Sequence, residues 1–245
     1  MRKITHSGAR AIACAVLTLV LLTAGAASFY GVQTVGLIGK ADHEPYYHGD
    51  RSRARVSIMI NVYENAEIVK KMVDCFSLSG AKATFFVGGC WADDNTETVR
   101  YIVENGMEIA NHGYFHKDSA KLSETQMRAE IENNHKLIKT LCGADMDLFA
   151  PPSGSFSEQA LKTIEKCGYK SIMWSKDTID WRDKDVDLLF KRATENVENG
   201  DLILMHPKEH SLIALKKILN YLKEKGFEIT TVSECIDENG QNGNT

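Results

Sequence analysis

Proline is scarce in this 245-residue chain, and its cysteines follow no recognisable pattern. The sequence contains only 4 Pro and 6 Cys, and no two cysteines form a C-x-x-C pair. This spacing excludes a zinc knuckle and does not indicate a disulfide framework. The chain has no long low-complexity run and no repeat of fixed period, so we do not expect an array of repeated units.

An excess of positive charge is also missing. Lys and Arg number 29 against 33 Asp and Glu, which gives a formal net charge of -4. This balance gives no reason to expect nucleic acid as a partner. The hydrophobic fraction of 43% and the charged fraction of 25% are typical of a globular chain with one sizeable core.

The first thirty residues contain no acidic side chain. Three basic residues precede an uncharged stretch from Ala11 to Tyr30 that is rich in Leu, Val and Ala. A positive segment followed by an apolar helix of about 20 residues is typical of an export signal, and this length would also span a bilayer as an uncleaved anchor. Ala24-Gly25-Ala26 fits a small-x-small cleavage site, so residues 1–30 are a signal peptide or a signal anchor. We therefore expect an exported protein of the bacterial cell envelope, either membrane-anchored or secreted.

The remaining chain divides into a linker, a domain and a tail. Residues 31–54 are polar, without clear periodicity, and are interpreted as a linker. Apolar runs that predict strands alternate with helical patterns over residues 55–236, and 237–245 form the tail. This alternation indicates an α/β fold with a mainly parallel sheet covered by helices. The predicted strands cover 56–62, 83–87, 107–110, 147–149, 169–174, 201–205 and 228–232; their periodicity does not decide between an open sheet and a barrel.

Polar side chains follow five of the predicted strands. The ends of parallel strands meet on one face of an α/β fold, so these side chains are expected to converge. Two histidines four residues apart can offer two neutral nitrogens to one divalent metal. Each residue alone is compatible with an ordinary structural role, and only their joint placement predicts a site. The residues are Asn61, Glu64, His112, His116, 151–154, Asp177, Asp180, Trp181 and His206.

Five short motifs in this order resemble the polysaccharide deacetylase family, also called the NodB-homology domain or carbohydrate esterase family 4. They are Ala83-Thr84-Phe85-Phe86, Asn111-His112-x-x-x-His116, Pro151-Pro152-Ser153-Gly154, Asp177-x-x-Asp180-Trp181 and Leu204-Met205-His206-Pro207. The resemblance covers roughly residues 52–236. It implies a distorted (β/α) barrel of about seven strands, here preceded by an N-terminal apolar helix. The implied activity is metal-assisted hydrolysis of the N-acetyl amide bond of cell-wall amino sugars. More narrowly, the chain resembles a sporulation-associated subgroup, which implies a peptidoglycan or spore glycan as the partner.

The resemblance also implies roles for individual residues. His112 and His116 would bind the metal, with zinc the expected ion. His206 would be the general acid that protonates the leaving amine, oriented by Asp180. The residues expected to contact the glycan are Pro152, Ser153, Gly154, Trp181 and Tyr114.

The family's first motif, Thr-Phe-Asp-Asp-Gly, is altered in this chain. Counting back from Ala83 without gaps, the corresponding residues are Met59-Ile60-Asn61-Val62-Tyr63. Asn61 replaces the general base and Val62 replaces the third metal ligand, while Ala150 replaces an Arg that pairs with the base. Catalytic zinc usually has three protein ligands, so we expect the metal to be weakly bound or absent unless Glu64 substitutes as a ligand.

Three functions are consistent with these changes. The first is a deacetylase with an impaired or altered metal site, since the Asp180 and His206 half of the motif set is retained. The second is a catalytically inactive glycan-binding module, with Trp181, Tyr114 and Phe115 as sugar-stacking surfaces. The third is a structural protein of the spore envelope in which the old site is vestigial.

Overall fold

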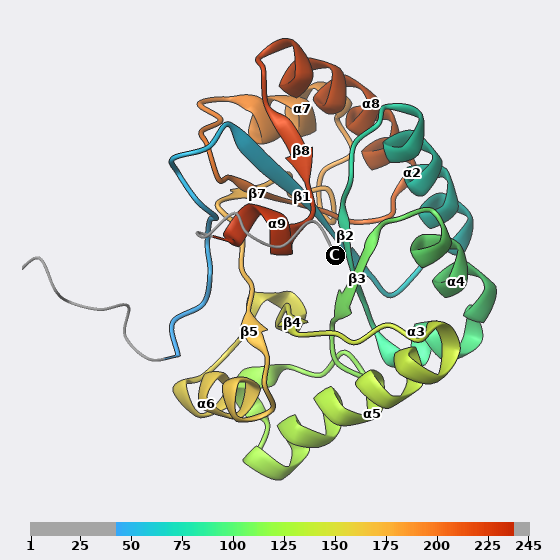
Figure 1. Ribbon diagram of the computed structural model, residues 1–245, viewed down its shortest axis with the longest axis vertical. Helices are drawn as coiled ribbons and strands as arrows, with labels where there is room; N and C mark the ends of the chain where they lie inside the picture. The colour runs from blue at the N-terminus through green and yellow to red at the C-terminus, as the bar shows by residue number, and fades with distance from the viewer. Residues whose placement is uncertain (1–42, 238–245) are drawn as a thin grey trace, which may run out of the picture. The chain divides into compact units, whose positions relative to one another are not determined.

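The computed structural model describes residues 43–237, and these residues contain one curled parallel sheet with helices packed against it. The strand order is β5-β4-β3-β2-β1-β7-β6, with β8 paired to β1, and every ladder is parallel (Figure 1). This arrangement confirms the predicted distorted (β/α) barrel. The strands are β1 (Arg55–Val62), β2 (Thr84–Val87), β3 (Glu108–Asn111), β4 (Leu148–Phe149), β5 (Lys170–Ser171), β6 (Lys176–Asp177), β7 (Leu202–Met205) and β8 (Glu228–Thr230).

Helix α5 (Glu124–Cys142) has a defined cap at each end. Ser123 and Gln126 form the two reciprocal hydrogen bonds of a capping box at the start of α5, and the left-handed Gly143 ends that helix. The helices are α2 (Ala66–Leu78), α3 (Gly89–Asp94), α4 (Thr96–Glu104), α5 (Glu124–Cys142), α6 (Glu158–Lys166), α7 (Val186–Thr194), α8 (Glu209–Glu224) and α9 (Val232–Ile236), with 3-10 turns at η2 (Ser119–Lys121) and η3 (Pro152–Gly154).

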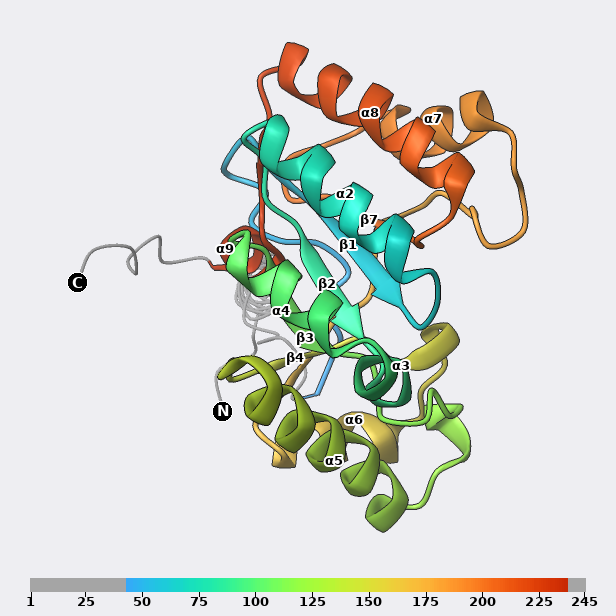
Figure 2. The same ribbon diagram turned by 90° about the vertical axis from the view of Figure 1, so that its right-hand side faces the viewer.

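Strand β1 is buried on both faces, which explains its nearly continuous apolar run. Ile58, Ile60 and Val62 belong to the core between the sheet and the helices, and Figure 2 shows α8, α2, α4 and α5 side by side over this face. Met59 faces the other way, into a second core that fills the concave side together with α9. Because side chains alternate along a strand, Asn61 shares the concave direction of Met59, and Val62 does not.

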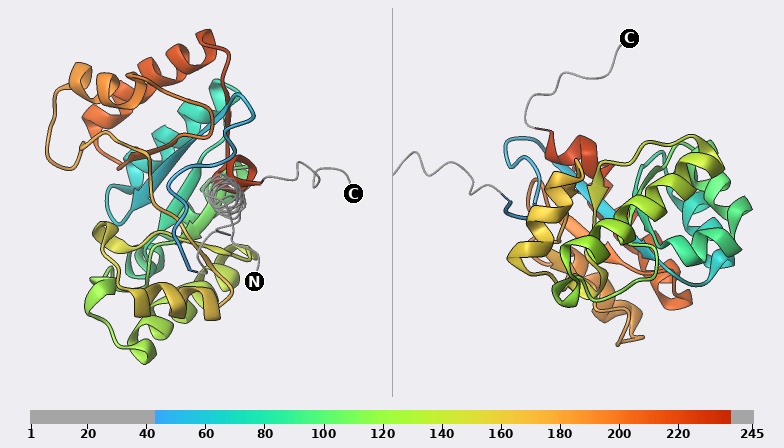
Figure 3. Two further views of the ribbon diagram at one scale, coloured as in Figure 1. Left: turned by 90° about the vertical axis from the view of Figure 1, so that its left-hand side faces the viewer. Right: turned by 90° about the horizontal axis from the view of Figure 1, so that it is seen from below.

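The segment before β1 is part of the folded unit (blue in Figure 3). Tyr46 forms a parallel bridge with Ile172, and His48 forms an antiparallel bridge with Asp201. Gly49 lies so close to the backbone that an added Cβ would be 2.1 Å from the Cys235 carbonyl oxygen. Residues 43–54, which the sequence indicates as part of a linker, thus include backbone pairs with the sheet and with α9, and hydropathy carries no signal for such pairs.

Several expectations fall on residues that the structure does not describe. The leader at 1–30, the linker residues up to 42 and the tail beyond 237 lie outside the described residues. Across residues 43–237, none of the helices has the length and apolar character needed to cross a bilayer.

Candidate active site

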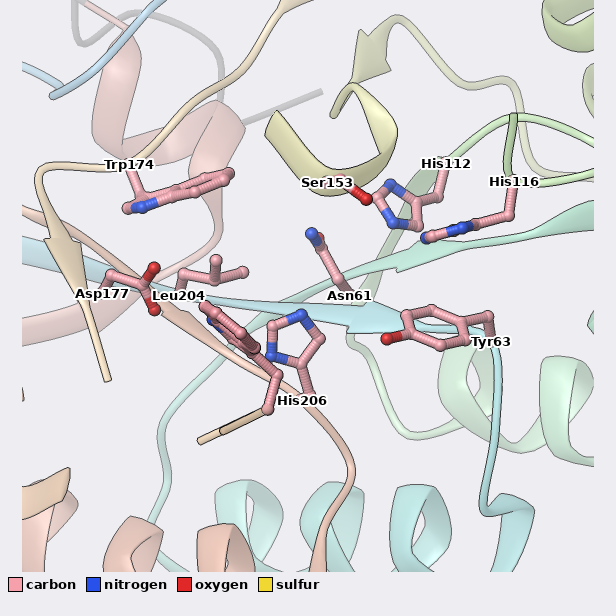
Figure 4. A pocket seen from close by; sticks show the side chains of 10 residues that line it. Asn61, Tyr63, His112, His116, Ser153, Trp174, Asp177, Leu204 and His206 are labelled. Carbon is pink, nitrogen blue, oxygen red and sulfur yellow. The ribbon is translucent and has the colours of Figure 1, made fainter. Parts of the chain in front are cut away.

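The carboxyl ends of β1, β3 and β7 meet the loops after β4 and β5 around one cavity of about 300 Å³. Figure 4 shows side chains from these distant segments pointing toward one another. Seven of the residues predicted from the sequence are among those that line it. The complete lining is Asn61, Tyr63, His112, His116, Ser153, Trp174, Asp177, Trp181, Leu204 and His206.

Asp180 and His206 form a tightly hydrogen-bonded pair on one side of the cavity. Nδ1 of His206 lies 2.7 Å from Oδ1 of Asp180, and the His206 backbone N–H donates to Oδ2 at 2.7 Å. The Ser211 hydroxyl also donates to Oδ2, at 2.6 Å. Burial favours the protonated carboxyl, but these hydrogen bonds and the His206 charge together hold the pKa of Asp180 below its usual value. An ionised Asp180 accepts the Nδ1 proton, so Nε2 of His206 is the nitrogen left for a ligand.

His112 lies on another side of the cavity and is fixed as a neutral imidazole. Its Nδ1 lies 2.8 Å from the Ala150 carbonyl oxygen, which can only accept, so the Nδ1–H donates and Nε2 carries the lone pair. Burial, with a smaller contribution from the neighbouring His116, lowers the pKa of His112 to about 3. Burial also lowers the pKa of His116. The two ring centroids are 4.9 Å apart, so the cavity presents two neutral imidazoles side by side.

The loop that carries both histidines is held from behind by α5. Oε2 of the buried Glu130 accepts the Phe115 N–H at 2.7 Å. The Asn134 amide donates to the Gly113 carbonyl at 3.2 Å and to the Asn111 Oδ1 at 2.9 Å. Two helix side chains thus satisfy loop groups that would otherwise be buried without partners.

Strained backbone also gathers at the cavity. His116, Ser153 and Ile179 have positive φ values of 55°, 57° and 55°, a conformation that costs about 1 kcal/mol or more for residues with a side chain. His116 and Ser153 line the cavity, and Ile179 precedes Asp180. Such strain persists where the surrounding contacts fix a required geometry, as they do here.

The positions altered in the first motif are buried and uncharged. Asn61 is 3% exposed, and its Oδ1 has no hydrogen-bond partner among residues 43–237. Val62 is fully buried in the core under the helices rather than in the cavity. Ala150 is likewise fully buried. An Arg here would be a desolvated cation facing a neutral amide, so the loss of the base and the loss of its partner are physically consistent.

These residues do not fit a catalytic zinc ion. His112 and His116 supply two nitrogens, but Glu64 forms an ion pair with Lys208 and is not among the residues that line the cavity. Among the residues described, no group of three His, Cys, Asp or Glu side chains is arranged to hold a metal ion. Because catalytic zinc usually needs three protein ligands and an open position, the donor set is one ligand short.

Four residues predicted to contact a glycan, Tyr114, Phe115, Pro152 and Gly154, are not among those that line the cavity. Tyr114 packs against α3, where an added Cβ on Gly89 would be 2.4 Å from its ring. Pro152 is buried, and Gly154 lies so close to Trp174 that a Cβ would be 2.7 Å from the indole. Pro152 and Gly154 therefore shape the loop that presents Ser153.

Three lining residues were not among the predicted site residues. They are Tyr63, Trp174 and Leu204. Each lies at or close to the carboxyl end of a strand. Only their position at a strand end could have identified these residues as part of the site. Their residue types could not, because Tyr, Trp and Leu beside a strand are usual in a hydrophobic core.

A family model for polysaccharide deacetylase matches residues 48–172. The chain belongs to the polysaccharide deacetylase family. It is 30% identical over 191 residues to a peptidoglycan-N-acetylglucosamine deacetylase of Bacillus cereus, a match that covers 76% of this chain and 70% of that one. It is 33% identical to the uncharacterized protein YlxY of Bacillus subtilis over 195 residues, 80% of this chain and 61% of that relative. The chain thus spans less than two thirds of YlxY.

Solved structures of the family include one whose description bears on this site. The wild-type BA3943 of Bacillus anthracis, described as a pseudoenzyme of carbohydrate esterase family 4, has a TM-score of 0.77 with 31% identity. The match covers 80% of this chain and 69% of that one. A BA3943 mutant described as having restored enzymatic activity also has a TM-score of 0.77, with 30% identity. The chain is therefore similar both to named deacetylases and to a named pseudoenzyme.

Proposed function

We propose that this domain binds an N-acetylated amino-sugar polymer of the bacterial cell wall, and that metal-assisted hydrolysis by the family's route is impaired. The single observation behind this proposal is the composition of the cavity. It keeps two neutral imidazoles and the Asp180–His206 pair, but a neutral amide stands where the base belongs. A recognition surface is thus retained while two catalytic groups are missing.

Aromatic side chains at the cavity support glycan binding. Trp181 is 56% exposed and Tyr63 is 39% exposed, although both are large apolar rings. Flat aromatic faces pack against the apolar faces of sugar rings, and their exposure without such a ligand is otherwise unfavourable. The family membership and the peptidoglycan deacetylases among the relatives point to a cell-wall glycan as the polymer.

Export to the cell envelope is part of the same proposal. The basic and apolar character of residues 1–30 supports a signal peptide or signal anchor. A spore glycan is included among the candidate polymers because the chain resembles sporulation-associated members of the family.

Residual deacetylation is a second candidate function. It is favoured by the intact Asp180–His206 pair. If the N-acetyl group of a substrate lay in the cavity, His206 would be positioned to donate a proton to the leaving amine. Asn61 cannot accept a proton from water, so any such turnover would lack general-base assistance.

One experiment separates the two functions. Calorimetry with N-acetylglucosamine oligomers and peptidoglycan fragments, in buffer with a chelator, measures binding without metal. Acetate release is then measured with and without added zinc, beside a His206→Ala variant. We expect heat of binding with the chelator present and acetate release no greater than that of His206→Ala. Absence of binding to every fragment would overturn the binding proposal, and acetate above the His206→Ala level would favour the enzyme.

A further inference from the structure

The ring of Tyr63 lies among three imidazoles. Its centroid is 4.3 Å from that of His116, 6.4 Å from that of His112 and 6.3 Å from that of His206. Figure 4 shows the ring beside the two metal-type histidines, with its hydroxyl directed toward His206. Tyr63 is also the residue that stands at the glycine of the family's first motif.

A metal ion between His112 and His116 would need room on this side of the cavity. Zinc lies about 2.0 to 2.1 Å from each nitrogen ligand and needs a third ligand and an open position for water in a tetrahedral arrangement. The two imidazoles supply only one side of that tetrahedron. The Tyr63 ring takes up space beside these imidazoles, with its centroid 4.3 Å from that of His116 and 6.3 Å from that of His206.

The local structure holds the ring in this position. Tyr63 is followed by Glu64, which pairs with Lys208, and by Asn65, whose amide donates to the Pro207 carbonyl at 2.9 Å. These contacts tie the segment that follows Tyr63 to the loop after β7.

We propose that Tyr63 blocks the metal position, so that restoring a carboxylate in the cavity does not restore zinc binding while this ring is present. The missing acid is then only one of two barriers to metal binding. This inference does not depend on the glycan proposal, because zinc alone is the probe.

The carboxylate is best introduced by Asn61→Asp, because Asn61 lines the cavity. Val62 lies in the core, where a carboxylate would destabilise the fold. Zinc affinity is measured by competition with a chromophoric chelator for wild type, Asn61→Asp, Tyr63→Ala and the double variant. We expect Asn61→Asp to change the zinc dissociation constant less than about 3-fold, and the double variant to bind about 30-fold or more tightly than Asn61→Asp; a 30-fold change corresponds to about 2 kcal/mol.

Three controls define the outcome. Tyr47→Ala removes another exposed tyrosine, which does not line the cavity, and should leave zinc binding unchanged in the Asn61→Asp background. His112→Ala should abolish the gain of the double variant, which places the ion at the imidazoles. Thermal unfolding checks each fold, with Tyr63→Ser as the replacement if Tyr63→Ala does not fold. The proposal is overturned if Asn61→Asp binds zinc as tightly as the double variant, or if the double variant shows no gain.

Discussion

The two sides of the cavity differ in how completely their polar groups are satisfied. On the His206 side, the buried Asp180 accepts a side-chain nitrogen, a backbone N–H and a hydroxyl at 2.6 to 2.7 Å. On the Asn61 side, the amide oxygen has no partner and the neighbouring Val62 is core. The buried polar groups around Asp180 therefore have partners, whereas among the described residues the buried Asn61 oxygen does not.

This difference teaches that the altered residues form a consistent set. A carboxylate at residue 61 would be a buried charge that needs a cation or a metal nearby. Here the cation position is Ala150, and Tyr63 lies beside the imidazoles. Asn61 and Ala150 are both neutral, so the cavity contains no unpaired buried charge at these two positions. Among the described residues, the Asn61 amide oxygen is nevertheless without a hydrogen-bond partner.

The largest effect is expected from removing the carboxylate of the intact side. Asp180→Ala leaves the His206 N–H groups and the Ser211 hydroxyl buried without an acceptor, and we expect a loss of about 3 to 5 kcal/mol in the free energy of unfolding. Urea denaturation measures it. Asp187→Ala is the control, because that carboxylate is exposed and pairs only with Lys217, so a change within about 0.5 kcal/mol is expected. A loss below about 1 kcal/mol for Asp180→Ala would contradict the comparison.

Acid should destabilise the fold through protonation of the buried His112. Because burial lowers the pKa of His112 to about 3, below the usual histidine value of about 6.5, the unfolded chain binds a proton between these pH values that the folded chain does not. Stability present in full above pH 6.5 is therefore lost as the pH falls toward 3. This group should account for about 3 kcal/mol between about pH 6.5 and about pH 4.

The control for the acid effect is a histidine away from the cavity. Equilibrium unfolding across this pH range should give a flatter curve for His112→Gln than for wild type. His48→Gln, at an exposed position, should leave the slope unchanged. Equal slopes for wild type and His112→Gln would show that the imidazole is not held neutral.

A smaller effect is expected from the helix that supports the histidine loop. Glu130→Ala leaves the Phe115 N–H without its acceptor, and we expect a loss of about 2 kcal/mol, with faster amide exchange at Phe115. Glu132→Ala, two residues along the same helix and paired only with Arg128, should change stability by less than about 0.5 kcal/mol. Similar losses for both variants would mean that helix α5 does not hold the loop.

The sequence predicted the parallel sheet, from its alternating strand and helix patterns, and the histidines of the cavity, from their motifs. The alternation of apolar runs was enough for the parallel sheet, and the motifs identified His112, His116 and His206, which the structure brings to one cavity. The short strand β6 was missed because two residues have no periodicity. The pairing of 43–54 was missed because it depends on backbone hydrogen bonds rather than on residue type.

Side-chain direction was the other quantity that the sequence could not supply. Adjacent positions in one motif point to opposite faces of β1, so Asn61 reaches the cavity and Val62 does not. Likewise, Tyr114 follows His112 closely but packs against α3, while Tyr63 turns toward the imidazoles. A motif fixes which residues are near a strand end, and only the loop conformation decides which of them face the ligand.

The smallest effect on stability, and a specific effect on binding, is expected at Trp181. Trp181 and Phe115 are matched in exposure, at 56% and 55%, but only Trp181 lines the cavity. Trp181→Ala should weaken binding of N-acetylglucosamine oligomers about 10-fold in calorimetry, because a stacked aromatic ring contributes about 1 kcal/mol or more. Phe115→Ala should leave the affinity unchanged, and both variants should stay within about 0.5 kcal/mol of wild type in unfolding. If the two substitutions weaken binding equally, the glycan does not bind in this cavity. The difference between the two sides of the cavity would then reflect descent from an active deacetylase and would have no role in glycan binding.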